Sequence, residues 1–329
     1  MTPSTTIPFA GLTPERILDA LESLGYRCDG ALMALNSYEN RVWQIGIEDA
    51  APVIAKFYRP ERWSDEQIAE EHEFTAVMVA DELPVVTPLV IDGRTLFAHE
   101  GFRFSVFPRQ GGRAPEFCEP QILEWMGRLM ARIHQVGARE PFVVRETLDI
   151  RSFGIDSRDW LLDSGVIPGE LASVWAGVAD QALDRAAEAF VRAGAVRQLR
   201  LHGDCHAGNV LWTQDGPHFV DFDDARMGPA IQDLWMLLSG DAEDMGRQFG
   251  HVLAGYEMFR EFDDRELQLV EALRTLRLMH HSAWLARRWD DPAFPSAFPW
   301  FATNRYWEER ILELREQIAA MQESALVIR

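Results

Sequence analysis

Three polar residues in the middle of the chain have the types and the spacing of a phosphoryl-transfer site. The segment LHGDCHAGNVLW places Asp204 five positions before Asn209, and Asp221 follows in FVDFDDA at the end of an apolar run. Phosphoryl transfer needs one carboxylate that orients the attacking hydroxyl and takes its proton, and an amide and a second carboxylate that hold the magnesium ion on the phosphates. We therefore expect Asp204 to be the base and Asn209 and Asp221 to bind Mg²⁺.

The other polar residues of this region have plainer interpretations. His202 and His206 favour hydrogen-bonded structural roles over catalysis, and a zinc site is disfavoured because the pair lacks the helix and glutamate of such motifs. Asp223 could hold a second ion or cap the next turn, whereas we favour capping for Asp224. Asp233, just inside a predicted helix, is expected to be a structural anchor that accepts backbone N–H groups.

Lys56 lies in the apolar run PVIAKFY, which predicts a strand that points this amine into a cleft. In phosphoryl-transfer enzymes such a lysine contacts the nucleotide phosphates and is oriented by a glutamate from the following helix. The predicted helix offers Glu70, Glu71 and Glu73. Counting back from the LPVV turn favours Glu71, with Glu70 as the second choice.

The loop NSYEN is where a phosphate-binding turn is expected, although it is neither a GxGxxG nor a Walker-type loop. A tight turn at Ser37 could offer backbone N–H groups and a hydroxyl to the phosphates of ATP. An ordinary hairpin loop explains this segment equally well.

The elements that must position these residues form an α+β pattern. Short strands are predicted first, around one helix over about 65–81, and nearly everything after Pro120 is predicted to be helical. We expect a bilobal chain, with a nucleotide-binding lobe over 1–108 and a helical catalytic and substrate lobe over 109–329. The predicted strands are 32–36, 41–47, 52–58, 96–99 and 102–107, and the later helices are about 121–137, 168–193, 231–238, 245–259, 265–289 and 304–321.

Composition narrows the functional classes. The 329 residues are 47% hydrophobic and carry a formal charge of −20, a field that repels nucleic acid and anionic membranes and weakly favours a cationic acceptor. No apolar run predicts a membrane span or a signal peptide, so a cytoplasmic location is expected. Three sparse cysteines fit a reducing compartment, and packing is a better explanation of Cys205 than a redox role.

Taken together, Lys56, a helix glutamate, the motif HGDxxxxN and the strand-end Asp221 resemble the aminoglycoside phosphotransferase and choline kinase superfamily, which has the protein-kinase-like fold. The blocks LNSYENRVWQIGIED, KFYRPERW and RRWDDPAFPSAFPW resemble more closely the stress-response serine/threonine kinases of bacteria. This resemblance implies an ATP- and Mg²⁺-dependent kinase that phosphorylates serine or threonine hydroxyls of proteins. It places the base at Asp204, the metal ligands at Asn209 and Asp221, and a nucleotide contact at Ser37.

Two alternatives to a protein kinase remain open. One is a small-molecule kinase for an amino alcohol, a sugar or an aminoglycoside, with an acceptor pocket near Asp290, Asp291 and Trp300, although that segment is equally well explained as a structural loop. The other is a scaffold that binds nucleotide without turnover, which the intact catalytic residues disfavour. The segment after Asp221 is too short for a phosphorylated activation loop, so regulation of that kind is not expected.

Overall fold

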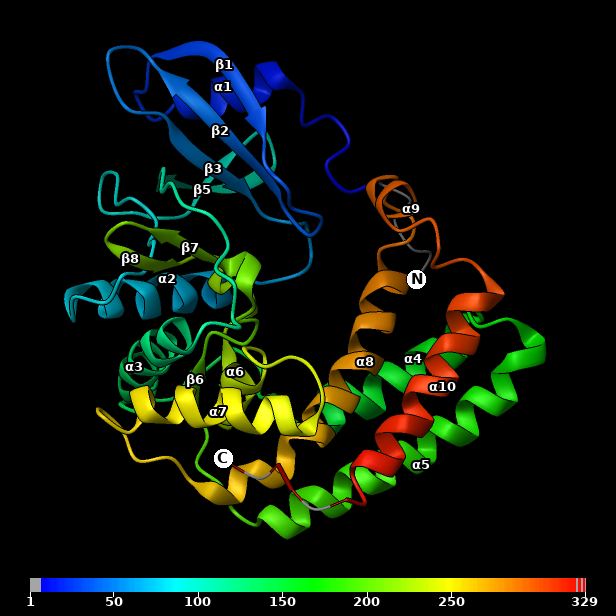
Figure 1. The fold of residues 1–329 in the computed structure, drawn as a ribbon. Coiled ribbons are helices and arrows are strands. Elements are labelled where there is room, and N and C mark those ends of the chain that lie inside the picture. Colours follow the sequence, from blue (N-terminus) through cyan, green and yellow to red (C-terminus); the bar gives the residue numbers. More distant parts are fainter. Residues whose placement is uncertain (1–6, 324, 327, 329) are drawn as a thin grey trace. The chain divides into compact units, whose positions relative to one another are not determined.

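The computed structural model describes residues 7–323, 325–326 and 328 and forms two compact units (Figure 1). The first unit comprises the residues up to Pro115 together with Gly208–Asp223, and the second comprises Glu116–Ala207 and the residues from Asp224 onward. The segment 208–223, which the sequence placed in the helical lobe, therefore groups with the strand-rich first unit.

A five-stranded antiparallel sheet forms the centre of the first unit and contains the five strands expected from sequence. Its strands lie in the order β1-β2-β3-β5-β4. The second strand has the bounds expected from sequence, whereas the first begins earlier and ends sooner than expected. The strands are β1 (Cys28–Ala34), β2 (Arg41–Ile47), β3 (Val53–Phe57), β4 (Phe97–His99) and β5 (Phe102–Pro108).

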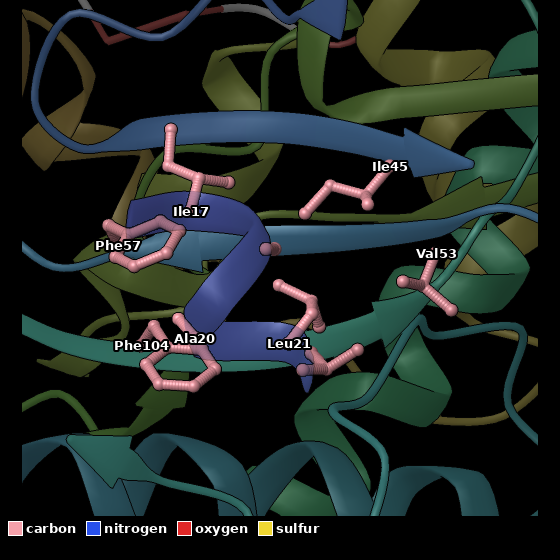
Figure 2. Packing of buried hydrophobic residues seen from close by; sticks show 9 residues of the cluster. Ile17, Ala20, Leu21, Ile45, Val53, Phe57 and Phe104 are labelled. Atoms are coloured by element: carbon pink, nitrogen blue, oxygen red, sulfur yellow. The ribbon is translucent and has the colours of Figure 1, made fainter. Parts of the chain in front are cut away.

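A short helix that the sequence analysis did not predict, α1 (Pro14–Glu22), packs on one face of this sheet. Thr13 caps it by accepting a hydrogen bond from the Arg16 backbone N–H. Its buried residues meet the side chains of alternate positions on the strands (Figure 2). Because side chains alternate across a strand, the intervening positions of β3 face the opposite side of the sheet. The core on the α1 side includes Ile17, Ala20, Leu21, Ile45, Val53, Ala55, Phe57, Phe104 and Val106.

Two further elements complete the first unit. Helix α2 (Asp65–Ala80) begins with a capping box in which Ser64 and Gln67 satisfy each other's backbone N–H groups. The hairpin of β7 (Val210–Thr213) and β8 (Gly216–Phe219) follows the motif HGDxxxxN in the sequence. It joins the first unit through a parallel bridge between Phe219 and Val85.

The second unit is mostly helical, as predicted. Helices α3 and α7 pack closely because glycines remove the side chains at their contact: a Cβ on Gly127 would lie 2.0 Å from the Val252 carbonyl oxygen. Two three-residue strands, β6 (Leu199–Leu201) and β9 (Arg226–Gly228), pair antiparallel. The helices are α3 (Pro120–Gly137), α4 (Asp156–Ser164), α5 (Gly169–Ala193), α6 (Ile231–Trp235), α7 (Ala242–Tyr256), α8 (Val270–Arg287), α9 (Ala293–Ala297) and α10 (Asn304–Ala320).

Shorter helical turns connect these elements. A π-helical turn over Ile150–Ile155 leads into α4, and a 3₁₀ turn over Asp264–Leu269 leads into α8. Two more 3₁₀ turns, Ala207–Asn209 and Phe222–Asp224, occur in the sequence motif itself. Within the described parts of the chain, no helix is both long and apolar enough to span a bilayer.

Candidate active site

A cavity of about 470 Å³ lies within the first unit, on the side of the sheet away from α1. Val42 and Gln44 of β2 are paired with Lys56 and Ile54 of β3, and all four line the cavity. One part of the wall is apolar, and another carries charged and amide side chains. Such a cavity suits a ligand with a flat apolar part and an anionic part. The apolar lining includes Met33, Leu35, Val42, Ile54, Val86, Phe107, Leu211 and Val220.

Lys56 is the centre of the polar end of this cavity. Its Nζ lies 2.9 Å from Asp221 Oδ1, 3.1 Å from Asp223 Oδ1 and 3.9 Å from Glu71 Oε1, and its side chain is 7% exposed. Burial on its own lowers the pKa of Lys56, but Asp221, Asp223 and Glu71 together raise it well above its usual value. The amine is therefore a fixed positive charge.

The structure places Glu71, and not its helix neighbours, beside Lys56. Glu71 is 3% exposed, whereas Glu73 is exposed and Glu70 is half-buried. Helix α2 presents Glu71 on the same buried face as Ile68 and Thr75, which follows from helical spacing of three to four residues. The capped start of α2 thus determines which carboxylate orients the lysine.

Asp221 and Asn209 line the same cavity. Asp221 has a φ of +59°, an unusual conformation for a residue other than glycine that marks strain at functional positions. Its side chain is 49% exposed. Asn209 ends a 3₁₀ turn, and its carbonyl accepts a hydrogen bond from the Val220 N–H at 3.0 Å.

The donor atoms that these two residues offer fit a magnesium ion. Carboxylate and amide oxygens are the hard ligands that Mg²⁺ prefers, and Mg²⁺ is usually held by one or two protein groups, with phosphates and water completing its octahedron. No group of three or more His, Cys, Asp or Glu side chains in the described parts of the chain could hold a metal ion by itself. A site of two protein ligands that a nucleotide completes agrees with this arrangement.

The turn 36–40 holds Ser37 at the edge of the cavity. The buried Asn40 anchors this turn: its side-chain oxygen accepts the Arg59 backbone N–H at 3.0 Å, and its amide donates to Asp223 Oδ2 at 3.2 Å. Glu39 pairs with the Arg59 guanidinium at 3.0 Å. The loop is therefore fixed from several directions, unlike an ordinary hairpin loop.

Asp223 is the residue of this region whose role the sequence left open. Its carboxylate is 5% exposed and is shared between Lys56, Asn40 and the Arg62 guanidinium, which donates to Oδ2. Its oxygens are thus engaged by protein cations and an amide, which disfavours a second metal ion here. Sequence reasoning missed Asn40 and Arg62; the segment KFYRPERW, with two arginines directly after the lysine strand, was the available signal.

In the second unit, Asp233 anchors the loop that carries Asp204. The Asp233 carboxylate is fully buried and accepts the His202 N–H at 2.9 Å and the Gly203 N–H at 2.8 Å. His134 Nε2 lies 3.2 Å from the same carboxylate. The prediction that Asp233 is a structural anchor for backbone N–H groups is confirmed. Gly203 has a φ of +84°, which lets the chain turn sharply just before Asp204.

Asp204 is held at both of its carboxylate oxygens. Arg277 of α8 donates to Oδ1 at 2.6 Å, and His206 Nε2 lies 3.5 Å from Oδ2. Burial alone raises the pKa of Asp204, but the hydrogen bond with His206 and the charge of Arg277 outweigh it and hold the pKa below its usual value. The carboxylate is therefore ionised and oriented, as a base requires. Arg277 is a residue that the sequence analysis did not identify.

The neighbours of Asp204 have structural roles. His202 is fully buried, and its Nδ1 accepts the Asp204 backbone N–H at 3.4 Å. Cys205 is also fully buried, 3.7 Å from the sulfur of Met130, and burial raises the pKa of its thiol well above the usual value. A buried thiol of this kind is a poor nucleophile, which favours the packing role. Asp224 accepts two hydrogen bonds from Arg226 in the following turn, through its carbonyl and its carboxylate.

The alternative acceptor pocket is not supported by the local structure. Asp291 is 2% exposed, and its carboxylate accepts the Ala293 backbone N–H at 3.1 Å. Trp300 packs against the rings of Phe298 and Tyr306, although 44% of it is exposed. Asp290 is exposed. These local contacts fit the loop explanation of this segment.

Comparisons with known proteins agree with this geometry. A family model described as "Phosphotransferase enzyme family" matches residues 32–270. "Stress response kinase A" of Salmonella choleraesuis is 45% identical over 318 residues, which cover 97% of this chain and 96% of the relative. The protein of the same name in Escherichia coli is 45% identical over 323 residues, or 98% of each chain. "Serine/threonine protein kinase RdoA" of Salmonella typhimurium is 45% identical over 97% of this chain and 96% of its own length.

Solved structures share the fold at low sequence identity. An amicoumacin kinase, hAmiN, in complex with AMP-PNP, Ca²⁺ and Ami matches with a TM-score of 0.73 at 18% identity, and the match covers 96% of each chain. A microcompartment-associated aminopropanol kinase matches with a TM-score of 0.68 at 19% identity, covering 93% of this chain and 96% of that one. With the family model and the 45% identical relatives, the chain belongs to the phosphotransferase enzyme family and, within it, to the group of stress response kinase A.

Proposed function

We propose that this chain is an ATP- and Mg²⁺-dependent kinase of the bacterial cytoplasm that phosphorylates serine or threonine hydroxyls of proteins, including hydroxyls of its own chain, in a stress response. The observation that carries the kinase chemistry is the polar end of the cavity in the first unit, where Lys56, Glu71 and Asp221 meet. The protein acceptor is supported by the relative named as a serine/threonine protein kinase.

Each residue of the first unit has a part in this proposal. Lys56, oriented by Glu71, contacts the phosphates of ATP, and the turn at Ser37 contributes a hydroxyl and backbone N–H groups. Asn209 and Asp221 supply oxygen ligands to Mg²⁺. When bound, the ion neutralises charge on the phosphates and holds them for transfer.

The base belongs to the second unit. Asp204 takes the proton from the acceptor hydroxyl as its oxygen forms a bond to the γ-phosphorus, and the bond from that phosphorus to the β–γ bridging oxygen breaks, which releases ADP. Arg277 and the anchored loop keep the carboxylate ionised and in place. The reaction requires that the acceptor hydroxyl at Asp204 reach the γ-phosphoryl group of the nucleotide.

A small-molecule kinase is the second candidate, because the solved structures with the same fold include an amicoumacin kinase and an aminopropanol kinase. Purified protein with ATP labelled at the γ-phosphate and Mg²⁺ separates the two candidates when protein extracts and small hydroxyl compounds are offered in parallel. The proposal predicts label on proteins that disappears in Asp204→Asn. Label on small molecules alone would reject the protein acceptor, and nucleotide binding without any turnover would point to a scaffold.

Phosphoproteomics gives the cellular counterpart of this experiment. Cells that carry wild-type protein should contain serine or threonine phosphosites that are missing in cells with Asp204→Asn. Identical phosphosite profiles in the two strains would contradict the protein-kinase proposal.

A further inference from the structure

Arg277 makes the surroundings of Asp204 different from what the charge of the whole chain suggests. The net charge of −20 favours a cationic acceptor at long range. That field is screened over about 8–10 Å at physiological ionic strength. Arg277, in contrast, touches the carboxylate, with a nitrogen-to-oxygen distance of 2.6 Å. The local charge at the acceptor hydroxyl is therefore set by this arginine.

The guanidinium of Arg277 has capacity to bind a second group. Its side chain is 35% exposed, and Asp204 is its single hydrogen-bond partner among the residues that the structure describes. A guanidinium carries five N–H donors in a planar fork that matches carboxylate and phosphate groups. One donor on Asp204 Oδ1 leaves the others available to an acceptor molecule.

The other charged groups around this position do not compensate Arg277. Asp224 is paired with Arg226 at 2.9 Å. His206, 45% exposed, lies on the other oxygen of Asp204. Desolvation and the charges of Arg277 and Arg310 lower the pKa of His281 to about 4, so this exposed imidazole is neutral at physiological pH.

The reaction itself changes the balance of charge at this pair. When Asp204 takes the proton of the acceptor hydroxyl, its carboxylate becomes neutral and no longer offsets the charge of Arg277. An anionic group on the acceptor, close to the hydroxyl, would then offset the charge of Arg277 in place of Asp204. A cationic group at the same place would meet a like charge in both the ground state and the transition state.

We propose that Arg277 is a specificity-determining residue that selects serine or threonine acceptors with an acidic side chain next to the phosphorylated hydroxyl. This inference rests on the protein-kinase function proposed above. It reverses the weak expectation, drawn from net charge, of a cationic acceptor. Arg277 acts here on the acceptor and also orients the base, and the two roles give different kinetic signatures.

Matched peptides test the proposal. Three serine peptides are compared at saturating ATP and Mg²⁺. They are identical except for the residues on either side of the serine, which are glutamate in the first peptide, glutamine in the second and lysine in the third. A charge-assisted hydrogen bond predicts that kcat/KM for the glutamate peptide exceeds that for the lysine peptide by about 10- to 100-fold. Arg277→Gln should abolish most of this preference, and Arg277→Glu should reverse it, whereas Arg277→Lys should retain part of it.

The control is Arg274→Gln, on the same helix one turn away, where the arginine is ion-paired with Glu271 at 2.9 Å. This variant should keep the wild-type preference. Thermal unfolding of each variant reports folding independently of activity. A wild-type preference for the lysine peptide, or an unchanged preference in Arg277→Gln, would overturn the proposal. An equal loss of kcat on all three peptides would also overturn it, because it would assign Arg277 to the base alone.

Two small probes keep this inference separate from the protein-kinase proposal. If no peptide is phosphorylated but a small hydroxyl compound is, the protein acceptor is rejected. In that case kcat/KM is compared for a hydroxy acid and an amino alcohol of similar size. Preference for the hydroxy acid that is lost in Arg277→Gln supports the role of Arg277 in anion selection, and preference for the amino alcohol overturns it.

Discussion

The nucleotide side and the base side of this kinase are built in different ways. In the first unit, Lys56 and Asp223 are each held by several charged or polar partners and are almost fully buried. In the second unit, Asp204 is 21% exposed and is held by Arg277 and His206, which are themselves 35% and 45% exposed. The charged groups at the polar end of the cavity in the first unit therefore have fixed positions.

The difference in burial between these two groups of residues suggests how a kinase family can keep ATP as its phosphoryl donor while the acceptor molecule varies. A buried network in which every carboxylate has a cation is costly to change, because removal of one member leaves the others unpaired. A half-exposed pair such as Asp204 and Arg277 can exchange one partner for an acceptor at little cost. Four substitutions test this comparison, in order of decreasing effect.

The largest effect is expected for Asp204→Asn. Asparagine keeps the shape of the side chain but cannot take the proton, so kcat should fall about 10²- to 10⁴-fold. Turnover of labelled ATP with an acceptor measures this loss, and thermal unfolding serves as the control for folding. A variant that turns over at nearly the wild-type rate would show that another group is the base.

Asp223→Ala should cause the largest loss of stability on the nucleotide side. It removes one of the three carboxylates beside Lys56 and the carboxylate that lies nearest to the Arg62 guanidinium, and breaking these buried pairs costs about 3–5 kcal/mol of the free energy of unfolding. The matched control is Asp65→Ala, which breaks an exposed pair with Arg103 and should cost less than about 1 kcal/mol. Urea unfolding compares the two. Equal losses would contradict the claim that the buried network stabilises this unit.

The base side should respond to pH through Glu266. This glutamate is 2% exposed and accepts the Ile231 N–H at the start of α6, the helix that carries Asp233. Burial raises the pKa of Glu266 to about 7 from 4.5. The protonated Glu266 therefore contributes to the free energy of unfolding below about pH 4.5. This contribution, up to roughly 3 kcal/mol, is lost as the pH rises through about 7.

Glu266→Gln isolates that contribution, because glutamine still accepts the Ile231 N–H but does not ionise. The free energy of unfolding of the variant, relative to that of wild type, should therefore be higher at about pH 8 than at about pH 5. Urea unfolding at both pH values measures the difference. A difference between the two proteins that does not change with pH would show that Glu266 titrates normally.

The smallest effect is expected for Ser64→Ala. The change removes the capping box of α2, the helix that positions Glu71, and should cost about 1 kcal/mol. The decrease in the free energy of unfolding should be largely restored in Ser64→Asp, which can cap the same N–H. If the alanine variant unfolds like wild type, the cap does not contribute to the placement of Glu71.

Sequence patterns predicted the elements and residues that local spacing determines. The strand 41–47 lies between the polar segments NSYEN and EDAA, and the helix after Ser64 begins with a capping box. The count along that helix selected the glutamate that the structure places beside Lys56. Helix α1 was missed although Thr13 and Pro14 mark its start. The pair β6 and β9 was missed because three-residue strands carry too little alternation to recognise.

The residues that sequence reasoning missed at the site act through long-range contacts. Arg62 and Asn40 meet Asp223 from 161 and 183 positions away, and Arg277 meets Asp204 from 73 positions away. No local pattern in a single sequence reports such a pairing. An isolated arginine on a helix is indistinguishable from one that solvates its surface, so the partner of the base becomes visible only in three dimensions.

The central claim is that the first unit binds the nucleotide while Asp204 serves only the acceptor. Calorimetric titration of ATP with Mg²⁺ into Asp204→Asn and Asp221→Asn, alongside wild type, tests it most directly. We predict wild-type ATP affinity for Asp204→Asn and a loss of Mg²⁺-dependent affinity for Asp221→Asn. Equal weakening of ATP binding in both variants, or normal binding in Asp221→Asn, would contradict the division of roles.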